Sequence, residues 1–173
     1  MKPVSLLSAV EDILQQGCTL LKSVTDATYT RRQDGPHNSS LGAHYRHVLE
    51  HFICLLEGLE AGQIDYDQRR RNREIENSSL EALFATEELI RKFRDLPVSE
   101  LDRECTVVYS VGYGDSAALA VDSNVAREVM FCVGHAIHHY AILKLVAASM
   151  NVQLLYEFGV APSTLKHLEA QAR

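Results

Sequence analysis

The chain has 173 residues, of which 46% are apolar and 23% charged, and its 17 basic and 23 acidic side chains leave a net charge of −6. This length and composition are typical of one globular domain over residues 1–173 and exclude a disordered or collagen-like chain. The acidic balance argues against a nucleic-acid partner, which needs a basic face to neutralise phosphates. We find no apolar run of the ~18 residues that a membrane span needs and no signal peptide at the N-terminus. We therefore expect a cytoplasmic protein without a membrane partner.

The four cysteines fit that compartment. Cys18, Cys54, Cys105 and Cys132 are widely spaced, form no Cys-x-x-Cys pair and stand among apolar neighbours. This arrangement predicts buried free thiols that pack as small hydrophobic side chains.

Two helices are predicted in the first third of the chain. Residues 5–25 repeat apolar positions at the i, i+3, i+4, i+7 spacing of a one-sided helix. Residues 31–38 contain Asp-Gly-Pro and predict a loop, after which Ser39 and Ser40 can cap a helix from 41 to about 62. Residues 65–76 are polar throughout and predict a solvated connection. Its run of three arginines, 69–71, is short and flanked by acids, which favours a solvated surface over a phosphate site.

The remaining chain predicts two more long helices and one hairpin. Ser78 and Glu81 have capping-box spacing at the start of a helix that Pro97 closes. The predicted apolar face of this helix is Leu80, Leu83, Phe84, Leu89, Ile90, Phe93 and Leu96. Two β-rich arms, 105–111 and 117–121, flank a Gly-rich turn at 112–115 and predict a hairpin as the only sheet.

The longest predicted helix runs from Asn124 to about Met150, with Asp122 and Ser123 expected as its caps. It is apolar nearly all round, which is typical of a central buried helix. A short helix is expected after Pro162-Ser163. Four long helices with one hairpin insertion predict an all-α four-helix bundle.

Six of the eight histidines fall in two short clusters. His44, His47 and His51 lie along one side of the second helix, and His135 and His139 lie one turn apart on the last long helix. That face of the last helix also carries Glu128, Phe131, Ile142 and Val146, so we expect it to be the core face. His138 lies about 60° round from His135, and His37 and His167 are expected to be exposed.

Two buried imidazoles in an apolar helix need partners for their nitrogens, because burying an unpaired polar group costs free energy. A hydrogen-bonded core pair is one solution, and a divalent metal ion shared by His135, His139 and a histidine of the facing helix is the other. Such a three-histidine site leaves a position open for water or substrate. Helix geometry alone leaves the third ligand open, because His44 and His51 lie closer than His47 to the centre of their helix's apolar stripe. Three imidazoles suit zinc, nickel, iron or copper.

The segments 40–47 (SLGAHYRH) and 135–139 (HAIHH) resemble the DinB-like (YfiT-like) metalloenzyme superfamily. The resemblance implies a four-helix bundle of up-up-down-down topology that holds one divalent metal ion, with His47, His135 and His139 as ligands. Characterised relatives include bacillithiol and mycothiol S-transferases, maleylpyruvate isomerase and the iron-binding part of ergothioneine synthases. The chain departs from this pattern because Tyr-Ala-Ile follows the last ligand, where thiol transferases often have Arg-Gly-Gln. It also contains no tryptophan.

We therefore expect a metal-dependent transferase or hydrolase that acts on a small-molecule substrate, either a low-molecular-weight thiol or an electrophile. The metal would lower the pKa of a bound water or thiol. His138 and Glu128 are the candidate bases or orienting residues, and His44 or His51 could hydrogen-bond to ligands. The alternatives are a non-catalytic metal-binding or interaction bundle, because no clear nucleophile–base–orienter set is present, and a purely structural bundle. We also expect a homodimer, because the last long helix needs more apolar cover than three neighbours give.

Overall fold

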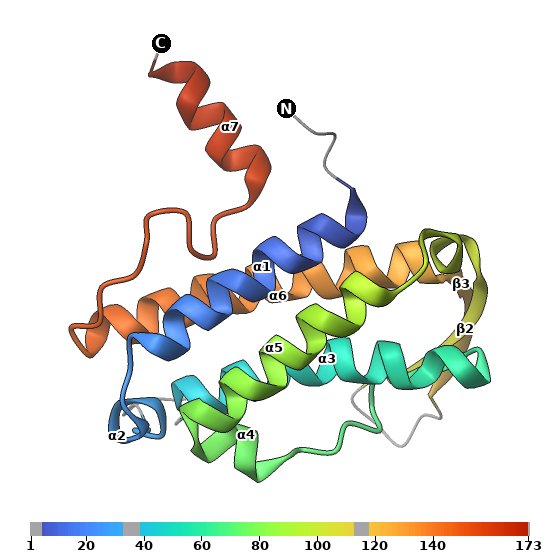
Figure 1. Cartoon of the computed structure of the whole chain (residues 1–173), viewed down its shortest axis with the longest axis horizontal. Coiled ribbons are helices and arrows are strands. Elements are labelled where there is room, and N and C mark those ends of the chain that lie inside the picture. Colours follow the sequence, from blue (N-terminus) through green and yellow to red (C-terminus); the bar gives the residue numbers. More distant parts are fainter. Residues whose placement is uncertain (1–4, 33–38, 113–117, 173) are drawn as a thin grey trace.

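The computed structural model describes residues 5–32, 39–112 and 118–172. The described chain is mostly helical with a small three-stranded sheet (Figure 1). The four long helices are α1 (Leu6–Lys22), α3 (Leu41–Ala61), α5 (Ser79–Asp95) and α6 (Val125–Ser149). The shorter ones are α2 (Asp26–Tyr29), α4 (Arg73–Asn77), α7 (Pro162–Gln171) and the 3-10 helix η1 (Val98–Asp102). His37 and most of the predicted hairpin turn lie outside the described residues.

The long helices pack so that α1 and α3 each contact both α5 and α6. In Figure 1, α1 and α6 run in one direction and α3 and α5 run in the other. The directions in chain order are therefore up, down, down, up, which corrects the expected up-up-down-down order. The reason is the connection 62–78, which contains α4 and returns along the molecule, so that α5 starts at the same end as α3 (Figure 1).

Local sequence signals place most helix ends correctly. The side chain of Ser40 accepts a hydrogen bond from the Ala43 N–H at the start of α3, and Gly62 ends that helix at φ 69°, a conformation that favours glycine. The Ser78 side chain caps α5 by accepting from the Glu81 N–H. The cap of α6 is Asn124. The expected caps, Asp122 and Ser123, pair with β2 instead, because the strand runs directly into the helix.

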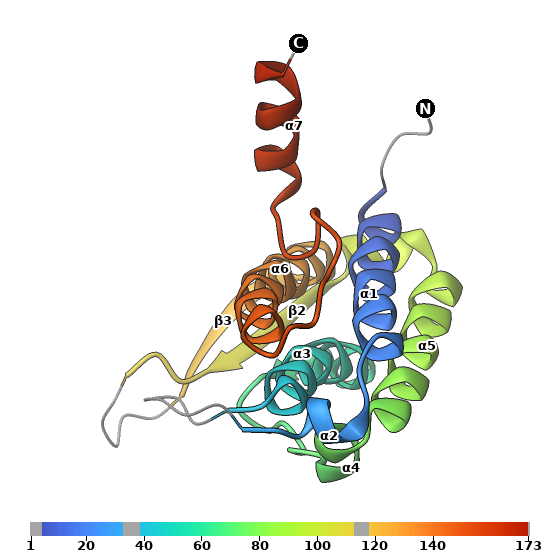
Figure 2. The ribbon, with the colours of Figure 1, turned by 90° about the vertical axis from the view of Figure 1, so that its left-hand side faces the viewer.

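The sheet comprises β1 (Gln63–Asp65), β2 (Glu104–Tyr109) and β3 (Leu119–Asn124), in the order β1-β2-β3. β2 and β3 form the expected antiparallel hairpin, with Val107 opposite Val121, but β1 adds a parallel strand, so the expectation that the hairpin is the only sheet is wrong. Figure 2 shows the sheet beside α6. Ile64 and Tyr66 are buried at this strand, although their neighbours are polar.

Two apolar faces are more exposed than the sequence pattern predicts. Met130 and Leu145 of α6 are 61% and 74% exposed, because the contacts of α6 with α1, α3, η1 and β3 leave these positions uncovered. Leu80 and Phe84 of α5 are also exposed, so the apolar face of that helix is narrower than expected. Helix α6 is thus not central, although its core stripe, with Ala136 and Tyr140, is fully buried.

Among the described residues, α6 is the one helix long and apolar enough to cross a membrane by length and composition. The mean hydropathy of its most apolar window is 1.4, and 28% of that window is buried. Polar residues, including Arg127, His135 and His139, interrupt this helix, so it contains no uninterrupted apolar run of the ~18 residues that a membrane span needs. The inner side of this helix nevertheless packs against α3 and carries two of the clustered histidines.

Close packing of α1 depends on a glycine. A Cβ atom at Gly17 would overlap the hydroxyl groups of Tyr45 on α3 and Tyr140 on α6. The absence of a side chain therefore lets α1 lie directly over both tyrosines. The neighbouring Cys18 is buried, as are Cys105 and Cys132, and Cys54 is half-buried; all four are free thiols, in agreement with the sequence.

Helix α7 stands apart from the other helices. It extends away from the body of the molecule in Figures 1 and 2, and it has no buried residue among those described. His167 lies on this helix and is exposed, as expected.

Candidate metal centre

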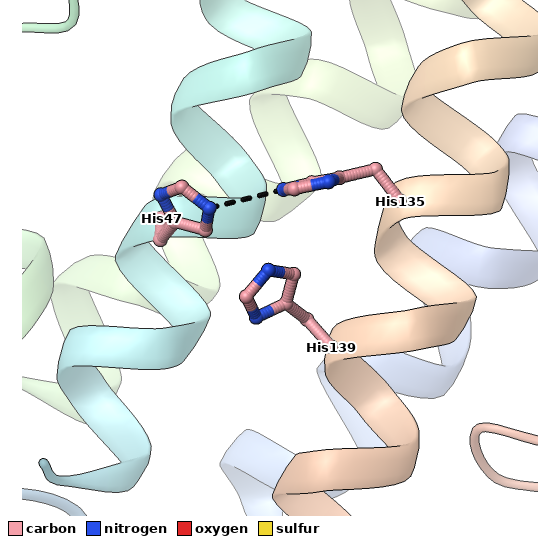
Figure 3. A group of neighbouring side chains, drawn as sticks. All are labelled: His47, His135 and His139. Carbon is pink, nitrogen blue, oxygen red and sulfur yellow. Dashed lines mark hydrogen bonds between the residues drawn. The ribbon is translucent and has the colours of Figure 1, made fainter. Parts of the chain in front are cut away.

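Three histidines from two helices meet between α3 and α6. His47 lies in the second turn of α3, and His135 and His139 project from successive turns of α6 (Figure 3). One ring nitrogen from each lies within 4.8 Å of those of the other two. The Nε2 atoms of His47 and His135 are 3.0 Å apart, so one ring donates its N–H to the other. The three side chains are half-buried, so the cluster keeps a side accessible to solvent.

The surroundings favour the neutral form of these imidazoles. Burial lowers the pKa of His47 to about 2, with His51, His139 and His135 adding repulsion between positive charges. Burial likewise lowers the pKa of His135 to about 4 and that of His139 to about 4. Neutral imidazole is the form that binds metal ions.

This donor set fits a divalent metal ion. The Nδ1 atom of His139 is buried and has no hydrogen-bond partner among the described residues, so this ring is incompletely satisfied by the protein. The group of three contains only imidazoles and no carboxylate. Zinc, nickel, iron and copper accept such donors, whereas calcium and magnesium prefer oxygen.

The other histidines of the second helix take different positions. The Nδ1–H of His51 donates to the carbonyl oxygen of His47 at 2.8 Å, and its buried ring lies over that of His135 with centroids 4.0 Å apart. Burial lowers the pKa of His51 to about 4. His44 lies beside His139, with ring centroids 5.7 Å apart. Neither alternate ligand belongs to the group of three convergent nitrogens.

The structure brings neither candidate base into this group. His138 is exposed, and its ring centroid lies 5.4 Å from that of His139. Glu128 is buried two turns before His135, where Oε1 accepts from the Ser123 hydroxyl at 2.6 Å and Oε2 accepts from the Tyr66 hydroxyl at 3.0 Å. Glu128 is therefore engaged with the sheet and not with the clustered imidazoles.

Two residues near the histidines were missed by the sequence analysis, which assigned them to a solvated connection. Tyr66 stacks on His51, with ring centroids 5.4 Å apart and planes inclined by 22°. The guanidinium group of Arg69 donates to the carbonyl oxygen of Tyr66, and its charge adds to the burial that lowers the pKa of His135. The alternation of apolar Ile64 and Tyr66 was the available signal for a half-buried strand.

Comparison with known structures identifies the fold. The DinB-like protein YjoA of Bacillus subtilis superposes with a TM-score of 0.65, at 16% identity, over 88% of this chain and 97% of that one. A DinB-like protein from Bacillus cereus superposes with a TM-score of 0.55, at 13% identity, over 87% of this chain and 93% of that one. The chain therefore has the DinB-like fold that its histidine motifs resemble. No protein-family model matches the sequence.

One relative found by sequence is a much longer protein. FK506-binding protein 5 of the fungus Rhizopus delemar is 31% identical over 108 residues, which is 62% of this chain. The chain spans 28% of the length of that relative. The similarity is thus confined to one part of that protein.

Proposed function

We propose that His47, His135 and His139 hold one divalent metal ion, and that the protein is a metal-dependent transferase or hydrolase of small molecules. The observation that carries this proposal is the convergence of three neutral imidazole nitrogens within 4.8 Å from two packed helices. Three protein ligands leave a coordination position for water or substrate, as catalytic zinc sites do. A low-molecular-weight thiol or an electrophile is the proposed substrate class.

The bound metal would supply Lewis acidity and lower the pKa of a bound water or thiol. The chain's own residues keep the ligands neutral and in place. The His51–His47 backbone hydrogen bond orients the His51 ring against His135, and the Phe131 ring lies next to both, with its centroid 5.7 Å from that of His135 and 6.0 Å from that of His51. These contacts restrict the His135 ring.

The remaining expectations are part of the same proposal. The packing of four long helices supports a four-helix bundle as the functional unit. The exposed apolar residues Met130 and Leu145 support a homodimer. We also propose a cytoplasmic location, for which the four free cysteines are the support.

A non-catalytic metal-binding bundle is the second candidate function. It is favoured by the composition of the cluster, which within the described residues contains neither a nucleophile nor a carboxylate base. The cysteines do not supply the nucleophile, because burial raises the pKa of Cys54 to about 11 and that of Cys132 to about 12.

Metal analysis followed by turnover separates these functions. Protein purified without a histidine tag should contain one equivalent of a transition metal by mass spectrometry, and chelation should remove it. The metal-loaded protein should then join a small thiol to an electrophile such as chlorodinitrobenzene faster than the chelated protein. Stoichiometric metal without turnover of thiols or ester substrates would favour the second function, and protein that binds no metal would refute both.

A further inference from the structure

A cavity of about 340 Å³ lies between the sheet and the first half of α6. The inner walls are Tyr66, Val107, Glu128 and Phe131, and Val121 and Arg127 lie among the residues around them. Two of these walls also border the histidine cluster, because Tyr66 stacks on His51 and Phe131 stacks on His135. A ligand that packs against Phe131 in this cavity would thus be separated from His135, a candidate metal ligand, by that one aromatic ring.

The carboxylate in the wall of this cavity has no cationic partner in the part of the chain that the structure describes. Glu128 is 6% exposed, yet the two hydrogen bonds that it accepts from described residues come from neutral hydroxyls, those of Ser123 and Tyr66. No lysine, arginine or histidine of the described residues forms an ion pair with it. Buried carboxylates are rarely left without a cation, and each oxygen of Glu128 can accept a further hydrogen bond.

The other lining residues also suit a cation with an apolar body. The cavity is lined by two carboxylates, Asp122 and Glu128, and by one cation, Arg127, which leaves one negative charge in excess among the described residues. Tyr66, Tyr109 and Phe131 provide aromatic rings, whose faces attract ammonium groups. A second cavity, of about 240 Å³, contrasts with it because its charges are already paired, as Arg70 with Glu57 and Lys92 with Glu88.

We infer that the cavity between the sheet and α6 binds an organic ammonium ion, whose charged group pairs with Glu128 and whose apolar body packs against Tyr66 and Phe131. Binding itself is independent of the metal. Only the further step, that this amine is the substrate or part of it, rests on the proposed function.

Binding can be measured on the chelated, metal-free protein by titrations followed with ¹H–¹⁵N NMR. The probes are 2-phenylethylamine, its neutral analogue 2-phenylethanol and its anionic analogue 3-phenylpropionate. The amine should bind with a Kd on the order of 1 mM and shift the amide signals of residues lining the cavity. The alcohol and the acid should bind about 10-fold or more weakly. Equal affinities for the three probes, or amine-induced shifts elsewhere in the protein, would overturn the inference.

The isosteric variant Glu128→Gln should lose affinity for the amine by about 10- to 100-fold while its affinity for the alcohol stays the same. Asp122→Asn is the matched control, since it removes an exposed carboxylate from the same cavity and should change amine affinity by less than about 3-fold. Undiminished amine selectivity in Glu128→Gln would refute the role of Glu128.

Val121→Arg keeps the test decisive if Glu128→Gln does not fold. Val121 is 56% exposed at the cavity, so an arginine there should be tolerated and should place a fixed cation near the carboxylate. Amine binding should then fall by about 10-fold or more, and unchanged binding would contradict the inference. Metal content measured on the same variants should stay at the wild-type value. If the wild-type protein binds the amine but binds no metal ion, the proposed function is refuted and the inference about the cavity stands.

Discussion

Helix α3 carries two polar pairs at the same i, i+4 spacing on adjacent faces, and they are completed in opposite ways. Arg46 and Glu50 face α4: Arg46 Nη1 donates to Glu50 Oε2 at 2.7 Å, and its Nε donates to Glu76 Oε2 at 2.9 Å. The other oxygen of Glu50 accepts from the backbone N–H of Asn72 at 2.7 Å. His47 and His51 instead face α6, where they meet His135 and His139, which are groups of their own kind.

The difference separates a structural cluster from a candidate binding site. Each charged side chain of the first cluster forms an ion pair within the protein, so the cluster needs no further partner. The second cluster contains three imidazoles and no carboxylate, and the buried Nδ1 of His139 has no hydrogen-bond partner among the described residues. A polar cluster that is not completed by these residues could hold an external partner such as the metal ion of the proposed function.

The largest effect should follow from truncating one of the three clustered histidines. His47→Ala, His135→Ala or His139→Ala removes a third of the protein donors and should abolish stoichiometric metal binding, measured by mass spectrometry after dialysis. The alternates His44→Ala and His51→Ala should keep one equivalent, because neither belongs to the convergent group. Full occupancy in His47→Ala with loss in either alternate would show that a different histidine is the third ligand.

Breaking the cluster of Arg46, Glu50 and Glu76 should lower the stability of the protein and leave its metal content unchanged. Glu50→Ala leaves Arg46 and the Asn72 N–H without their buried partner and should lower the free energy of unfolding by roughly 3 kcal/mol, measured by urea denaturation. Glu88→Ala is the control, since it breaks an exposed i, i+4 pair with Lys92 and should cost less than about 0.5 kcal/mol. Equal losses in the two variants would contradict the contrast between buried and exposed pairs.

The metal-free protein should lose stability as the pH falls from about 6.5 to about 4. Burial above all lowers the pKa of His135 and His139 to about 4 from the usual histidine value of 6.5, so the unfolded chain binds more protons than the folded one in this range. This contribution is complete above pH 6.5 and is lost as the pH drops. Urea midpoints should fall more steeply in wild-type protein than in the triple His→Ala variant, and parallel curves would contradict the prediction.

The smallest effect is expected for the exposed neighbour of the cluster. His138→Ala should weaken metal binding by no more than the 10- to 100-fold of an outer partner, and its competition titration with a chelator should still reach one equivalent. Its ring stands beside His139 but outside the convergent group. A complete loss of metal would make His138 a ligand.

Features encoded within one turn of helix were predictable, and those that depend on distant segments were not. Ser40 and Gly62 predict both ends of α3, and the one-turn spacing of His135 and His139 predicts that they act together. The choice of His47 came from the family resemblance, because its side-chain position depends on how α3 meets α6. Strand β1 escaped prediction because its partner, β2, lies about 40 residues further along the chain.

The helix directions were missed for a similar reason, since they depend on the path of residues 62–78, and the cap of α6 was misplaced because strand pairing engages Asp122 and Ser123. The exposed side of α6 could not be read from its composition. An apolar residue has the same sequence signature whether a neighbouring helix covers it or not, as Ala136 and Leu145 show.

Gly17 links helix α1 to the two helices that carry the clustered histidines. Tyr45 and Tyr140, whose hydroxyls lie at this glycine, stand two residues before His47 on α3 and directly after His139 on α6. Helix α1 contributes none of the three clustered histidines, yet at Gly17 it touches one side chain from each helix that carries them. A single methyl group at position 17 would overlap both tyrosines at once, so a substitution in α1 would displace side chains next to His47 and His139.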